Sequence, residues 1–86
     1  MNIATLKSKI AGTLRDELAR EWGLPMERYR TRVETDTSYR ADTGTVDLWI
    51  TFTHRTTGAT IVIENIIADA DAGTILEYYP PKLELA

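Results

Sequence analysis

The clearest hydrophobic pattern in the chain is the alternation across Thr45–His54, which reads TVDLWITFTH. Its large apolar residues stand at every second position: Val46, Leu48, Ile50 and Phe52. Period-two alternation is typical of a strand that buries one of its two faces. Trp49 is the exception on the other, mostly polar face. We therefore predict a central strand here, with its apolar face packed against a helix.

The N-terminal segment has a helical period instead. Its large apolar residues recur every three or four positions, at Ile3, Leu6, Ile10, Leu14, Leu18 and Trp22. This stripe predicts an amphipathic helix over residues 3–22. Asn2 can cap the start of the helix, and Gly23, followed by a leucine and a proline, can end it.

Residues 29–39, 60–68 and 74–79 are predicted to form three further strands. The first of them mixes Thr, Val and Tyr with charged residues, which favours an edge strand. In the last, Leu76 and Tyr78 are expected to face inward. The tail at residues 82–86 can be frayed or can add a strand to the edge of a partner, and the sequence leaves open whether it pairs with its own sheet.

In the hairpin between the second and third strands, the sequence does not decide whether Asn65 points into the core or outward. A turn at Thr57-Gly58 would pair Phe52 with Ile63 and Ile50 with Asn65. Asn65 would then enter the core and need a hydrogen-bonding partner there. Alternatively, a bulge near Glu64-Asn65 would turn Asn65 outward and bring Ile66 into the core.

One helix followed by four strands with short connections predicts antiparallel neighbours. The apolar stripe of the helix and the apolar face of the sheet must cover one another. We therefore expect a two-layer α+β fold, in which the helix packs on one face of a four-stranded antiparallel meander. The length of 86 residues predicts a single domain over residues 1–86.

The sheet face away from the helix is the strongest candidate for a functional surface. In the hairpin pairing above, Trp49 lies opposite Ile66 on this face, close to Val62, with Arg30 and Arg32 on the neighbouring strand. Contiguous exposed apolar side chains tend to mark interfaces, and Trp and Arg often anchor binding. We expect these five residues to contact a protein partner, unless the tail of the chain covers Trp49.

The residues that could carry chemistry do not form a recognisable site. His54 is the only histidine, Asp47 lies on the opposite face of its strand, and the chain contains no cysteine. Asp69–Gly73, DADAG, begins like a calcium loop, but glycine and proline occupy its fifth and twelfth positions. Ordinary turn residues explain this segment. We therefore expect no enzymatic activity, no cofactor and no bound metal ion.

Composition and charge narrow the possible partners. The net charge is −3, with +2 on residues 1–40 and −5 on residues 41–86, so two copies could attract one another. An acidic chain without an RNA-binding aromatic signature argues against nucleic acid. Nothing approaches the roughly 18 consecutive apolar residues of a membrane span, and the first residues are too polar for a signal peptide. These features predict a cytoplasmic protein.

An aliphatic strand followed by DADAGTIL resembles the end of PepSY-type domains, which pair a helix with an antiparallel meander. The resemblance covers the C-terminal third and rests on Asp69, Gly73 and the aliphatic residues that follow. It implies the same helix-and-meander arrangement, and we transfer no residue role from it.

These observations predict a small non-enzymatic interaction or regulatory module that binds a protein partner or itself, as a homodimer, through the open sheet face or an edge strand. The alternative is a small-ligand-binding domain or minor enzyme with a pocket between helix and sheet. That pocket would use Tyr29, Tyr39, His54 or Tyr78. A flat apolar patch around Trp49 favours the first function, whereas a cavity with convergent polar groups favours the second.

Overall fold

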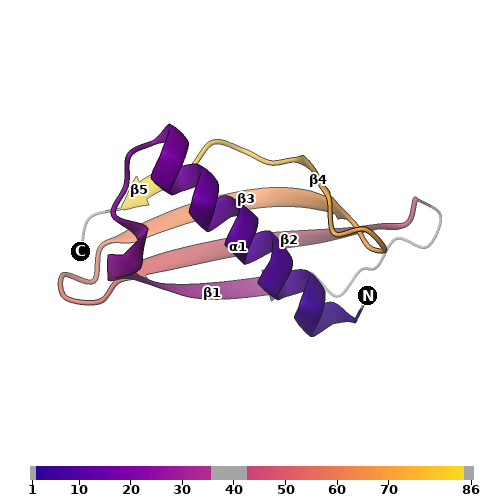
Figure 1. Ribbon diagram of the computed structural model, residues 1–86, viewed down its shortest axis with the longest axis horizontal. Coiled ribbons are helices and arrows are strands. Elements are labelled where there is room, and N and C mark those ends of the chain that lie inside the picture. The colour runs from indigo at the N-terminus through magenta and orange to yellow at the C-terminus, as the bar shows by residue number, and fades with distance from the viewer. Residues whose placement is uncertain (1, 36–42, 85–86) are drawn as a thin grey trace.

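The computed structural model describes residues 2–35 and 43–84 (Figure 1). The elements, in chain order, are α1 (Ile3–Glu21), the 3-10 turn η1 (Met26–Arg28), β1 (Tyr29–Thr35), β2 (Thr45–His54), β3 (Thr60–Asp69), β4 (Ile75–Glu77) and β5 (Lys82–Glu84). Helix α1 crosses one face of an antiparallel sheet. The predicted two-layer α+β fold is confirmed. Among the described residues, no helix is long and apolar enough to cross a membrane.

The sheet has the order β1-β2-β3-β4, and β5 also pairs with β3. Strand β4 pairs near Ile67, whereas β5 pairs with Thr60–Val62, so the two short strands share one edge of β3. Strand β1 forms the opposite edge and has no neighbour beyond it among the described strands, as predicted. Over Lys82–Glu84 the tail is therefore a strand of its own sheet, which answers the question that the sequence left open. The predicted strand residues 36–39 and tail residues 85–86 lie outside the described residues.

The core lies between α1 and the sheet. Its buried apolar residues are Leu6, Ile10, Leu14 and Leu18 of α1, Met26 of η1, Val46, Leu48, Ile50 and Phe52 of β2, and Ile61, Ile63, Ile66 and Ala68 of β3. The predicted inward faces of α1 and β2 are thus confirmed. Ile3 and Trp22, at the two ends of the helical stripe, remain half exposed. The stripe is therefore longer than the part of the helix that the sheet covers.

Arg15 joins α1 to the start of β1. Its guanidinium group donates hydrogen bonds to the carbonyl oxygens of Met26 and Tyr29, the latter at 2.9 Å, and to the hydroxyl of Thr31. The same group lies 5.6 Å from the centre of the Phe52 ring, within cation–π range. A charged residue on the helix thereby satisfies backbone oxygens at the border of the core.

The pairing of β2 with β3 differs from the predicted pairing by two residues. Phe52 pairs with Ile61 and Ile50 pairs with Ile63. The connection is longer than a two-residue turn, because the His54 N–H donates to the Ala59 carbonyl at 2.8 Å. A slip of two residues returns each side chain to the same face. The inward faces were therefore predicted correctly although the pairing was wrong.

A bulge in β3 decides which residues enter the core after Ile63. The pairing shifts between Leu48 and Ile50, opposite Asn65 on the other strand. Asn65 has a positive φ of 54° and is exposed, whereas Ile66 is buried. The bulge alternative is thus confirmed. Ile67, expected inward in the unbulged pairing, is only partly buried and faces the other side.

The C-terminal segment packs against α1 through Tyr78. Its hydroxyl donates a hydrogen bond to the Glu17 carboxylate. This bond, together with partial burial and the charge of Glu17, raises the pKa of Tyr78 to about 12. Ile75 and Tyr78 pack against the core, whereas Leu76 is 57% exposed. The prediction that Leu76 faces inward was therefore wrong, because Ile75 pairs with the buried Ala68 and takes the inward position.

Substitutions at Asn65 test the bulge. We expect Asn65→Gly to leave the free energy of unfolding unchanged or raise it by less than about 1 kcal/mol, because glycine adopts positive φ without strain. Asn65→Ala should lower it by about 1 kcal/mol, since its Cβ strains the left-handed conformation. Urea denaturation of the two variants provides a matched comparison. An alanine variant as stable as the glycine variant would contradict the bulged geometry.

The contact between Tyr78 and Glu17 predicts a loss of stability in alkali. The pKa of Tyr78 is raised in the folded state, so its stabilising effect is complete below about pH 10 and is lost as the pH rises towards 12. Between pH 9 and pH 11, we expect the free energy of unfolding to fall more in the wild type than in Tyr78→Phe. Tyr79→Phe, at a 58% exposed position, should behave as the wild type does. Identical pH dependence in the wild type and Tyr78→Phe, measured by urea denaturation, would rule the contact out.

Candidate functional site

The first candidate site is the sheet surface opposite α1, which we call the outer face. Its outward side chains are Arg30, Arg32 and Glu34 of β1, Asp47, Trp49, Thr51 and Thr53 of β2, Thr60, Val62, Glu64 and Ile67 of β3, and Lys82 and Glu84 of β5. Figure 1 shows α1 on one side of the sheet only, and no other described helix is longer than the single turn η1. The outer face is therefore not covered by a described helix.

Four of the five predicted partner-binding residues lie on this face. Trp49 is 36% exposed and borders a hollow of about 340 Å³ together with Val62, Glu64 and Asn65. Arg30 and Arg32 of β1 lie beside Thr53 and Thr51 of β2. The structure thus brings an exposed indole, an aliphatic side chain and two arginines onto one surface.

The fifth predicted residue, Ile66, does not belong to this surface. It is fully buried in the core, so its predicted exposure beside Trp49 was wrong. The bulge reverses the alternation of β3 at Asn65, and the asparagine side chain takes the place expected for the isoleucine. The polar residue inside an aliphatic strand was the signal in the sequence for this change.

The charges of the outer face are arranged in rows across the strands. One row runs Arg30, Thr53, Thr60, Glu84, and the next runs Arg32, Thr51, Val62, Lys82. In the second row the charges are neutralised along the strands, since Arg32 pairs with Glu34 at 2.9 Å and Lys82 pairs with Glu64 at 3.4 Å. The first row carries a positive charge at one edge of the sheet and a negative charge at the other.

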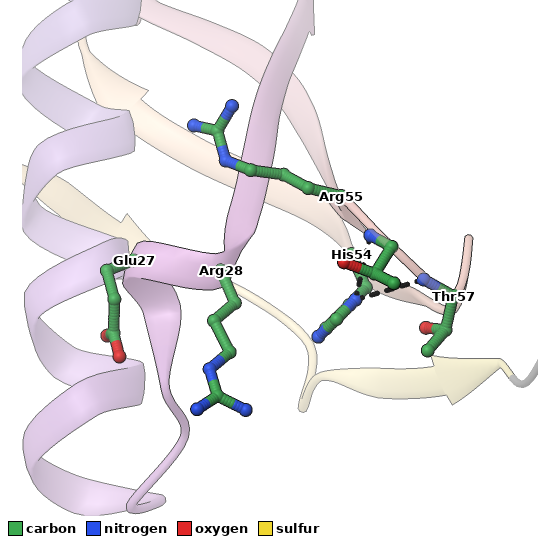
Figure 2. Close-up of a pocket in the computed structure, with 6 residues that line it drawn as sticks. Glu27, Arg28, His54, Arg55 and Thr57 are labelled. Atoms are coloured by element: carbon green, nitrogen blue, oxygen red, sulfur yellow. Dashed lines mark hydrogen bonds between the residues drawn. The ribbon is translucent and has the colours of Figure 1, made fainter.

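The second candidate site lies at the end of the β2–β3 hairpin (Figure 2), and sequence reasoning missed it. A hollow of about 420 Å³, which we call the hairpin hollow, is lined by Glu27, Arg28, His54, Arg55, Thr56 and Thr57. The Arg55 N–H donates to the Arg28 carbonyl at 2.9 Å and so fixes the hairpin against η1. Arg28 and Arg55 are far apart in the sequence, and the antiparallel pairing of β1 with β2, which begins at Tyr29 and His54, brings their backbones together.

His54 has a defined orientation in the hairpin hollow. Its Nδ1 accepts hydrogen bonds from the backbone N–H groups of Thr56, at 3.2 Å, and Thr57, at 3.1 Å. Its ring meets the Tyr29 ring edge-on, with the ring centres 5.1 Å apart. Because Nδ1 is an acceptor, the neutral ring carries its proton on Nε2. His54 is thus held by backbone amides and can offer one N–H donor to a ligand.

The Asp69–Gly73 segment, which began like a calcium loop, has a structural role. The carboxylate of Asp69 accepts the N–H groups of Asp71, at 2.9 Å, and Ala72, at 2.8 Å, and these bonds lower the pKa of Asp69. Gly73 follows with a φ of 70°, so the segment forms a turn, as predicted. Within the described ranges, no group of three or more His, Asp or Glu residues is placed to hold a metal ion.

Of the residues predicted for a pocket between helix and sheet, those that the structure describes are not gathered there. Buried apolar side chains fill that space. Tyr29 and His54 meet at the hairpin end, whereas Tyr78 lies against Glu17 of α1. Tyr39 lies outside the described residues.

Comparisons with known proteins identified no relative of this chain. No protein-family model matches the chain, and no curated protein or solved structure is significantly similar to it.

Proposed function

We propose that this protein is a non-enzymatic protein-interaction module, and that it binds a second copy of itself through the outer face. The observation that carries the proposal is the exposed Trp49 beside the hollow formed with Val62, Glu64 and Asn65. Tryptophan is among the residues that contribute most to binding when a partner buries them. An antiparallel sheet with one uncovered face can bury it against a second sheet.

The charges of the outer face favour a second copy as the partner. Suppose that two outer faces pack together around a twofold axis that runs parallel to the strands and lies between β2 and β3. Each row then lies over the same row of the second copy, but runs in the opposite direction. Arg30 of one copy then lies over Glu84 of the other, because both stand in the same row at opposite edges. Trp49 of β2 lies over the bulge of the second copy's β3, at the hollow beside Asn65. The Arg30 row is thereby self-complementary, as a twofold dimer requires. The next row places Arg32 over Lys82, and each of these cations is already paired with a glutamate of its own chain.

The environment of His54 supports the non-enzymatic part of the proposal. Its Nδ1 is occupied by two backbone N–H groups rather than by a carboxylate that would orient it as a general base. The cytoplasmic location remains part of the proposal, supported by the absence of cysteine from the sequence.

The free edge of the sheet offers a second interface. If two copies of β1 paired antiparallel about Val33, each Arg32 would stand opposite a Glu34 of the other chain. The two interfaces respond differently to Arg32→Glu. Edge pairing would be weakened by the resulting repulsion between acidic residues. Outer-face pairing would be kept, because Arg32 there lies over Lys82 of the second copy.

Replacement of the outward tryptophan tests the outer face. We expect the wild type to be a dimer and Trp49→Ala to raise the dimer dissociation constant roughly thirty-fold or more, or about 2 kcal/mol. Trp22→Ala is the matched control, because Trp22 is 54% exposed at the end of α1, away from the sheet. Sedimentation equilibrium measures all three proteins. A monomeric wild type, or equal weakening by both substitutions, would refute self-association through Trp49.

Charge reversal tests the orientation of the two copies. Arg30→Glu and Glu84→Arg should each weaken the dimer, because each places like charges opposite one another. The double variant restores opposite charges and should dimerise more tightly than either single variant. Edge pairing through β1 predicts no such rescue, since Glu84 lies on the other edge of the sheet. Sedimentation at low ionic strength keeps the charge effect measurable.

A further inference from the structure

Two arginine side chains line the hairpin hollow, although the net charge of the whole chain is −3. Arg28 comes from the end of η1 and Arg55 from the hairpin, and both are exposed. Glu27 is the only acidic residue among the six that line the hollow. Neither arginine side chain forms an ion pair or a hydrogen bond with another described residue. Local positive charge is therefore left over at this end of the sheet.

The backbone that carries these groups is fixed. The Arg55 N–H bonds to the Arg28 carbonyl at 2.9 Å, and the Gly58 N–H bonds to the His54 carbonyl at 3.1 Å. Two further backbone N–H groups orient the His54 ring, which leaves its Nε2–H available as a donor. The two arginine side chains, rather than the backbone, would have to rotate to reach a ligand beside His54.

Figure 2 shows that Arg28 and Arg55 extend in different directions, and that the His54 ring lies at a level between them. Both arginine side chains are exposed, and both would have to turn towards His54 to hold one anion together with it. Rotation of exposed side chains takes picoseconds to nanoseconds, so this adjustment is fast. The Thr57 hydroxyl, at the rim of the hollow, adds one more polar group.

We propose that the hairpin hollow binds a phosphate group, held by the guanidinium groups of Arg28 and Arg55 and by the Nε2–H of His54. Guanidinium groups donate paired hydrogen bonds to phosphate oxygens, and such charge-assisted bonds are the strong ones. The terminal oxygens of a phosphate monoester can accept donors from all three directions. A carboxylate, with two oxygens in one plane, matches this arrangement less well.

This site is independent of the proposed dimer. All the residues that hold the phosphate come from one chain, on η1 and the hairpin. Arg30 lines another hollow on the hairpin, of about 360 Å³, and is not needed here. The Trp49→Ala variant should therefore bind phosphate as the wild type does.

Because His54 is the only histidine, its imidazole gives a single reporter signal in NMR spectra. We would titrate the protein with inorganic phosphate at fixed pH and ionic strength, and with O-phosphoserine and adenosine monophosphate in parallel. The expected result is a saturable shift of the His54 ring signals and of the Thr56 and Thr57 amides, with a dissociation constant on the order of 1 mM for inorganic phosphate. Tighter binding of one of the two esters would identify the source of the phosphate group.

The variants make the test specific. Arg28→Ala and Arg55→Ala should each weaken binding at least fivefold, whereas Arg55→Lys should retain part of it. Arg20→Ala removes the same charge from an exposed position on α1 and should have no effect. A shift that does not saturate, that sodium chloride reproduces, or that persists unchanged in Arg55→Ala would overturn the proposal. An equal loss in Arg20→Ala would do the same, because it would show a response to net charge alone.

Discussion

Burial of one face of β3 governs how the two layers and the outer face are built. Continuous alternation would place Asn65 in the core and Ile66 in solvent. A buried amide without a partner costs about 1–3 kcal/mol, and an exposed isoleucine forfeits the gain from its burial. The bulge removes both costs, because Asn65 adopts a φ of 54°, which asparagine tolerates better than most residues. Ile66 then completes the apolar layer beneath α1.

The same bulge shapes the outer face. Once Asn65 points outward, it borders a hollow beside Trp49 instead of the aliphatic neighbour that unbroken alternation would have supplied. The bulge exchanges one isoleucine for another on this surface, since Ile66 turns into the core and Ile67 turns outward, and the indole keeps Val62 as an apolar neighbour among threonines and charged residues. Its opposite charges at the two edges, Arg30 and Glu84, make it suited to a partner with the reverse arrangement.

Polar contacts at the edges of the two layers connect the helix to the sheet and to the C-terminal segment. The hydrophobic pattern of the sequence does not predict them. Arg15 reaches from α1 to the carbonyl oxygens at the start of β1, and Glu17 receives the hydroxyl of Tyr78 from the C-terminal segment. At the other end of β2, a hydrogen bond joins the backbones of Arg28 and Arg55. Each contact joins residues whose proximity follows from the antiparallel topology and not from their spacing along the chain.

The order of apolar and polar residues was enough to predict the helix, the central strand, the edge position of β1 and the outward direction of Trp49, because periodicity reports which face of an element is buried. It predicted the pairing of β2 with β3 wrongly by two residues, since a slip of two residues preserves every face. Folding in three dimensions settled that pairing, the choice between Asn65 and Ile66, and the return of Lys82–Glu84 to its own sheet. Those outcomes depend on hydrogen bonds and packing between distant segments, which a local pattern does not encode.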